Sequence, residues 1–242
     1  MTKSYPEPPW TLRGRAVAFP LLLRRDLVAM PAPLEPLSFG GRVPGVAIVA
    51  WYGPGSSLEY HELAVLAAAR CGGRVGASVL ELRVDDPASE AGGREVWGLD
   101  KRLAAFDWAA AGRSETVRVG DGAEFRFTAR FRHLFGRALP IPAVPLRAFV
   151  AREGRPYAFA VRVSGRVRPV RLEEGIVAWS HAPRGIGEAV DPETTPRAAR
   201  PGHARSGEPR TGIRLAGLPR LGPGFGLAFE RLHARVDAPR PI

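Results

Sequence analysis

The chain has 242 residues, of which 45% are hydrophobic and 24% charged, and this ordinary globular composition excludes a disordered chain. Its 28 glycines and 24 prolines favour many short elements joined by turns, which excludes a long helical bundle. The formal charge of +11 is typical of nucleic-acid binders, but the arginines are spread along the chain without a basic helix. We therefore expect no nucleic-acid partner.

The length fits a single β-rich domain over residues 1–242. No apolar run approaches the roughly 18 residues that cross a bilayer, so no membrane partner is expected. The single cysteine, Cys71, can form no internal disulfide, and this favours a cytoplasmic location.

The first half of the chain predicts extended strands. Arg15–Leu23 follows a proline-rich start, and Val43–Tyr52 is a continuous apolar run that is typical of a buried strand. The alanines of Glu62–Arg70 favour a helix by propensity, whereas the Cys-Gly-Gly turn before Val75–Val84 favours a hairpin. We expect the hairpin.

A short helix is predicted after this hairpin. Asp86 is an N-cap acceptor, and Pro87 follows it at the first helical position, where a missing N–H costs nothing. The helix is expected to run towards Gly98, which places Lys101 just beyond its end.

The second half alternates apolar with polar residues at the period of a strand. The candidate strands are Glu115–Val119, Glu124–Phe131, Tyr157–Val163, Arg166–Leu172 and Phe225–Val236. Three prolines interrupt the apolar run Ala138–Val150, so a regular ladder is not expected there. Residues 182–223 are predicted to form a long surface excursion.

These elements predict a β-dominated α+β fold with few short helices. A closed or conical β-barrel is expected, because an open sheet of this many strands would leave its edges exposed.

Lysine is rare in this chain, where Lys3 and Lys101 are the two lysines among 35 basic residues. Only an amine can lose its proton and attack a carbonyl, so a lysine in an arginine-rich chain points to chemistry that guanidinium cannot perform. The simpler alternative is a lysine at a helix end with its ammonium in water.

The segment around Lys101, GREVWGLDKRLA, resembles the active-site segment of the acetoacetate decarboxylase family. The resemblance implies that Lys101 forms a Schiff base. Residues 51–63, WYGPGSSLEYHEL, are similar to a second family segment and place Glu62 at its catalytic glutamate, 39 residues before Lys101. Residues 9–15, PWTLRGR, place Arg15 at the family's active-site arginine, 86 residues before Lys101.

The match departs from the family pattern beside the lysine. Arg102 replaces a second lysine, and Asp100 replaces the usual proline. Both are expected to tune the pKa of the neighbouring amine, since a nearby cation disfavours the ammonium and a nearby carboxylate favours it. Ala47 stands where acetoacetate decarboxylase has a second acidic residue.

The resemblance implies a lyase that decarboxylates a small β-keto acid or a related oxo acid, and a homo-oligomeric assembly. Two alternatives stay open: an imine-dependent aldolase or dehydratase on the same fold, and a non-catalytic barrel that binds a small ligand. The lysine takes the place of a separate cofactor, and the histidines show no metal-ligand spacing. We expect neither cofactor nor metal.

Overall fold

The computed structural model describes residues 5–121, 125–134, 136–179, 211–214 and 224–242. In the first half, the strands are β1 (Trp10–Arg24), β2 (Glu35–Pro36), β3 (Arg42–Tyr52), β4 (Tyr60–Cys71), β5 (Arg74–Val84) and β6 (Lys101–Leu103). The helical segments are a 3-10 turn η1 (Arg25–Leu27), the helix α1 (Pro87–Gly92) and a π-helical turn η2 (Gly93–Trp97). Within the described residues, α1 is the only α-helix.

The second half consists of strands. They are β7 (Ala105–Ala111), β8 (Ser114–Gly120), β9 (Phe125–His133), β10 (Leu139–Arg152), β11 (Arg155–Trp179), β12 (Thr211–Arg214), β13 (Phe225–Val236) and β14 (Arg240–Pro241). The predicted strands Tyr157–Val163 and Arg166–Leu172 are thus parts of one long strand. Apart from β12, the predicted excursion over 182–223 lies outside the described residues.

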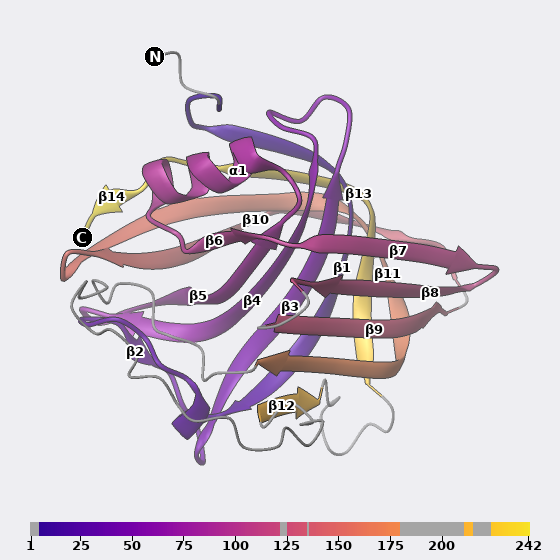
Figure 1. Cartoon of the computed structure of the whole chain (residues 1–242), viewed down its shortest axis with the longest axis horizontal. Coiled ribbons are helices and arrows are strands. Elements are labelled where there is room, and N and C mark those ends of the chain that lie inside the picture. The colour runs from indigo at the N-terminus through magenta and orange to yellow at the C-terminus, as the bar shows by residue number, and fades with distance from the viewer. Residues whose placement is uncertain (1–4, 122–124, 135, 180–210, 215–223) are drawn as a thin grey trace, which may run out of the picture.

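The strands form one sheet in the order β10-β5-β4-β3-β1-β13-β11-β9-β8-β7. Strand β10 pairs with both β5 and β11, so the sheet returns on itself as a ring. In Figure 1, β7, β8 and β9 run side by side on the right of the molecule, and α1 lies at the upper left. The strand-dominated fold predicted from the sequence is confirmed.

Both faces of the sheet are buried, because β1, β3 and β4 alternate apolar residues on each side. On β1, Val17 and Phe19 point into the largest core cluster, whereas Leu12 and Ala16 belong to a cluster on the other face. Paired residues of neighbouring strands share a face, so Glu62 lies on the face of Ala16, two strands away.

Two local predictions agree with the structure. β4 and β5 form the expected hairpin, and its turn residues Gly72 and Gly73 have φ of 52° and 79°, which only glycine adopts readily. Helix α1 begins after Asp86, as the cap and proline predicted.

The run Ala138–Val150 differs from the prediction, because β10 does form a ladder with β11 through it. The prolines are tolerated for two reasons. The ladder has an irregularity between Ile141 and Val144, and β10 meets its other neighbour, β5, only through Ala148 and Phe149. Proline is accepted at such edges and bulges, where its missing N–H breaks no bond.

Among the described residues, no helix is both long and apolar enough to cross a membrane.

Candidate active site

Lys101 is held between the sheet and the helical segment. It begins β6, where it pairs in parallel with Leu82 of β5. The Asp86 carboxylate caps α1 by accepting a hydrogen bond from the Ser89 backbone N–H at 2.6 Å. The π-helical turn then ends at Gly98, whose φ is 68°, and the Arg94 guanidinium donates to the Lys101 carbonyl at 2.8 Å. Local capping and turn chemistry therefore fix the position of the Lys101 backbone.

Gly93 allows this segment to approach the lysine side chain closely. A Cβ atom at Gly93 would lie 2.8 Å from Cδ and 2.9 Å from Cε of Lys101. These distances are below van der Waals contact, so only a residue without a side chain leaves the lysine stem in its present place.

The Lys101 side chain is buried, with 4% of its area exposed. Its Nζ donates to Glu62 Oε2 at 2.9 Å and to Ser89 Oγ at 3.0 Å. Nζ also lies 5.0 Å from the ring centroid of Tyr60 and 5.7 Å from that of Trp10. A carboxylate, a hydroxyl and two aromatic faces therefore surround the amine nitrogen.

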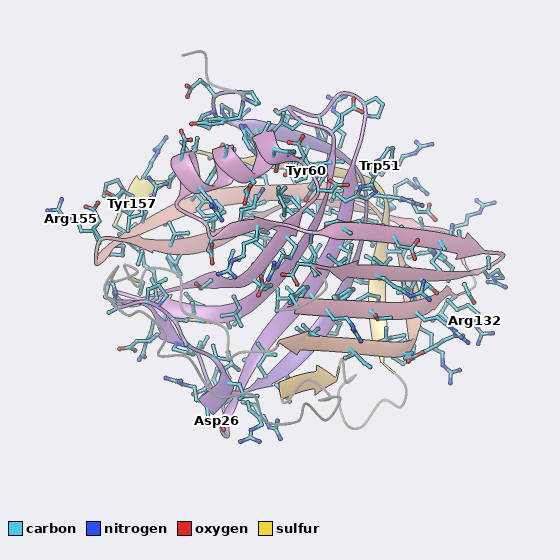
Figure 2. The ribbon with its side chains drawn as sticks, in the orientation of Figure 1. Asp26, Trp51, Tyr60, Arg132, Arg155 and Tyr157 are labelled. Carbon is cyan, nitrogen blue, oxygen red and sulfur yellow. The ribbon has the colours of Figure 1, made fainter. Side chains whose placement is uncertain are left out.

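Glu62 lies at the centre of a hydrogen-bond network. Besides Lys101, it accepts from the Tyr60 hydroxyl at 3.2 Å and from the Tyr52 hydroxyl at 3.4 Å. Tyr52 and Tyr60 face each other across β3 and β4, with ring centroids 5.1 Å apart. Figure 2 labels Tyr60 at the start of β4 and Trp51 on the neighbouring strand.

Burial raises the pKa of both phenols well above the usual value, and the Glu62 carboxylate raises it further. Tyr52 and Tyr60 therefore keep their protons at neutral pH and act as donors to Glu62. The arrangement can hold a carboxylate beside an amine and stabilise it with two neutral hydroxyl groups.

Asp100 and Arg102 pair with each other. The Arg102 Nη2 lies 2.6 Å from Asp100 Oδ2, and Arg94 contacts the other oxygen of the same carboxylate at 3.8 Å. Successive strand residues point to opposite sides, so Arg102 is half-exposed whereas Lys101 is buried. The carboxylate hydrogen-bonded to the lysine belongs to Glu62.

Arg15 is not brought to Lys101 and Glu62. It pairs with Trp51, which pairs with His61, so it lies on the sheet face opposite Glu62. Its guanidinium carbon lies 4.4 Å from the ring centroid of Trp108, and its Nη1 lies 3.9 Å from Glu115 Oε2. The structure thus brings two of the three residues expected to be catalytic into contact.

Sequence reasoning missed Ser89, Tyr60, Tyr52 and Trp10, which complete the surroundings of the amine. One signal was available: Tyr60 lies two residues before Glu62 on β4, and the period of a strand puts both on one face. Ser89 had no such signal, because its contact with Lys101 depends on how α1 packs against β6.

Comparison with known proteins extends these observations. The model of the acetoacetate decarboxylase family matches residues 25–140, a range that contains both Glu62 and Lys101. The chain is acetoacetate decarboxylase-like. No curated protein sequence matches it.

Solved structures share the acetoacetate decarboxylase-like fold. Acetoacetate decarboxylase from Legionella pneumophila has a TM-score of 0.59 at 15% identity, covering 100% of this chain and 90% of that one. The enduracididine biosynthesis enzyme MppR, in complex with pyruvate, has a TM-score of 0.57 at 16% identity, covering 98% and 91%. An acetoacetate decarboxylase-like enzyme from Sphingomonas wittichii has a TM-score of 0.50 at 15% identity, covering 98% and 94%.

Proposed function

We propose that this protein is a Schiff-base-forming carbon–carbon lyase that decarboxylates a small β-keto acid, such as acetoacetate, or a related oxo acid. The observation that supports this most is the partly buried contact of 2.9 Å between Lys101 Nζ and Glu62 Oε2. The proposal also rests on the matching family model, since acetoacetate decarboxylase-like proteins are enzymes that act on small substrates.

In the proposed reaction, Lys101 transfers a proton to Glu62, and the neutral amine attacks the substrate ketone. Loss of water gives a protonated imine. The bond to the carboxylate then breaks, carbon dioxide leaves, and the electron pair moves to the imine nitrogen to form an enamine. The proton that Glu62 first accepts leaves with the water, so Glu62 takes up a new proton from solvent and passes it to the enamine carbon. Hydrolysis then releases the ketone and Lys101.

The hydroxyls that surround Glu62 support its role in proton transfer. Tyr52 and Tyr60 donate to the carboxylate, and they stabilise its charge in a largely buried site. The Ser89 hydroxyl lies 3.0 Å from the amine and can hydrogen-bond to the carbinolamine oxygen as that group forms and leaves. Arg15 lies on the opposite face of the sheet, so the proposal gives it no part in orienting the substrate carboxylate.

A second candidate reaction uses the same imine for aldol condensation, retro-aldol cleavage or dehydration. It is favoured by the similarity to MppR, one structure of which holds the condensation product of pyruvate and imidazole 4-carboxaldehyde. An imine stabilises a carbanion whichever bond breaks, so the fold alone does not choose between these reactions. Carbon dioxide release, assayed beside aldehyde and unsaturated-acid formation, separates them.

The non-catalytic alternative is a barrel in which Lys101 pairs with a carboxylate and contacts an anionic ligand, and the sequence offers Asp100 as that carboxylate. In the structure, Asp100 pairs with Arg102 and Arg94, and the carboxylate that pairs with Lys101 is that of Glu62. A cytoplasmic, homo-oligomeric protein is part of the proposal and follows from the sequence and the family resemblance.

Borohydride trapping tests the proposal directly. Incubation with a panel of oxo acids and borohydride should give a stable adduct, which peptide mass spectrometry maps to Lys101. Lys3→Arg is the matched control, because it leaves Lys101 as the sole lysine and should retain the adduct. Lys101→Gln should abolish it. An adduct at another position, or none with any oxo acid, contradicts the proposal.

A further inference from the structure

A hollow of about 320 Å³ opens on the face of the sheet opposite Glu62. Strands β1, β7, β8, β9, β11 and β13 line it. Its polar and aromatic lining includes Arg15, Trp108, Glu115, Phe131, His133 and Arg168. Lys101 and Glu62 take no part in this lining, so the hollow is separate from the candidate active site.

An irregularity in β13 lies beside the hollow. Gly14 of β1 pairs with Leu232 and Ala16 pairs with Phe229, so two residues lie between these pairs on β13 but only one on β1. The ladder with β11 has a shift at the same level, between Ser164 and Val167. An extra strand residue bends the strand and re-aims its side chains, a feature that is enriched next to functional sites.

Glu115 fixes the polar groups of the hollow. Its carboxylate accepts from the Trp108 indole at 2.5 Å, and His133 Nε2 lies 2.5 Å from its other oxygen. Arg15 approaches the same carboxylate at 3.9 Å. Because these neighbours use the accepting capacity of Glu115, that carboxylate is not the group left to bind a ligand.

Unused hydrogen-bonding capacity remains mainly on the basic side chains. Arg168 pairs with Glu230 through Nη2, yet its Nε is buried and has no hydrogen-bond partner among the described residues. Nδ1 of His133 is likewise buried and has no hydrogen-bond partner among the described residues. The Arg15 guanidinium lies over Trp108, and 45% of the Arg15 side chain is exposed. Two guanidinium groups with free donors suit a carboxylate.

The rest of the lining is apolar. Phe131 provides aromatic surface, and the small side chain of Ala228 leaves room beside it. A volume of this size lies at the lower end of the range for small-molecule sites. The geometry points to a second binding site, separate from Lys101, for a small organic carboxylate with an apolar body.

Phenylacetate is a suitable probe, because it combines a carboxylate with an aromatic ring. Its titration can be followed by the indole N–H signals of the five tryptophans, assigned by substitution with phenylalanine. The Trp108 signal should shift and saturate, since this indole lies in the hollow. The Trp10 signal, next to Lys101, should stay in place. Uncharged phenylacetamide should leave both unchanged.

Variants locate the bound anion. Arg168→Gln and Arg15→Gln should each weaken binding by about tenfold or more, the expected loss for one charge-assisted hydrogen bond. Arg74→Gln removes the same charge from an exposed position on β5 and should bind like the wild type. Because Arg15 is half-exposed, its variant gives a result even where Arg168→Gln fails to fold.

Lys101→Gln separates this inference from the proposed function, because it removes the nucleophile and should leave phenylacetate binding unchanged. Three results overturn the second site: no saturable shift of the Trp108 signal, equal affinity of the Arg15, Arg168 and Arg74 variants, or loss of binding in Lys101→Gln. Failed borohydride trapping with intact phenylacetate binding contradicts only the lyase proposal.

Discussion

Glu62 and Lys101 form an ion pair whose side chains are 17% and 4% exposed. Removing one partner of such a pair costs about 3–5 kcal/mol of stability, because the other charge is left buried and unpaired. The two tyrosines reduce the cost of burying the carboxylate by donating hydrogen bonds to it. At the scale of residues, stability and proposed chemistry therefore depend on the same four side chains.

The raised pKa of Tyr52 and Tyr60 predicts a loss of stability at alkaline pH. Below the usual tyrosine pKa of about 10, folded and unfolded chains both keep the proton. Above it, the unfolded chain releases a proton that the folded chain retains, so the free energy of unfolding falls as pH rises. Each tyrosine contributes about 1.4 kcal/mol per pH unit in this window.

Urea unfolding at several pH values above about 10 measures this slope. Tyr52→Phe should reduce it by roughly 1.4 kcal/mol per pH unit relative to the wild type. Tyr157→Phe, which removes a tyrosine that is not bonded to Glu62, is the matched control. Equal slopes for the wild type and Tyr52→Phe would show that this phenol ionises as readily in the folded chain.

At the scale of elements, the segment formed by α1 and η2 acts as a support for Lys101. The cap at Asp86 places Ser89, and the turn that ends at Gly98 returns the chain to the sheet. Gly92 and Gly93 let this support pack closely: a Cβ at Gly92 would lie 2.7 Å from the Trp10 ring, and one at Gly93 would meet Lys101.

Gly93→Ala should therefore impair the lysine without unfolding the protein. Gly93 has ordinary right-handed helical angles, so alanine adds no backbone strain, but its methyl group displaces the Lys101 stem from Glu62 and Ser89. The rate of borohydride trapping should fall about tenfold or more, as expected for the loss of one strong hydrogen bond. Ala91→Gly, in the adjoining helix α1, controls for a change in helix propensity. Trapping at the wild-type rate in Gly93→Ala contradicts this packing argument.

At the scale of the whole molecule, β10 exposes apolar side chains that the ring does not cover. Leu139, Val144 and Leu146 are 67%, 41% and 50% exposed. Prolines in the same strand lack the N–H groups that a further strand needs for pairing. Contact between side chains, rather than an extended ladder, is the means of association that this surface favours.

We expect a homodimer or larger oligomer that uses this part of β10. Light scattering coupled to size exclusion at high salt should give a mass above the 26.1 kDa of one chain. The double variant Leu139→Asp and Leu146→Asp should shift the mass towards the monomer. Phe39→Asp alters a side chain that is 66% exposed elsewhere on the surface and should not. A monomeric wild type across micromolar concentrations rules out the assembly.

The sequence by itself determined the features that depend on a few neighbouring residues. The hairpin turn at Gly72 and Gly73 needs positive φ, and the helix start at Asp86 needs an acceptor before a proline. Strand alternation likewise predicted β9, whose phenylalanines are buried and whose arginines are exposed. These signals act within one turn or one strand, so they can be seen without knowing the partner of each strand.

Tertiary structure alone decided which side chains meet. Two consistent spacings aligned Arg15, Glu62 and Lys101 with one family pattern, yet pairing through β3 puts Arg15 and Glu62 on opposite faces. Side chains alternate between the two faces of a strand, so a shift of one residue in the pairing moves a side chain from the face of the candidate active site to the face of the hollow. In the same way, Asp100 forms its ion pair with Arg102 and not with Lys101, and the packing of α1 brings Ser89 to the Lys101 amine. Such contacts depend on register and packing between distant segments, which local sequence patterns do not specify.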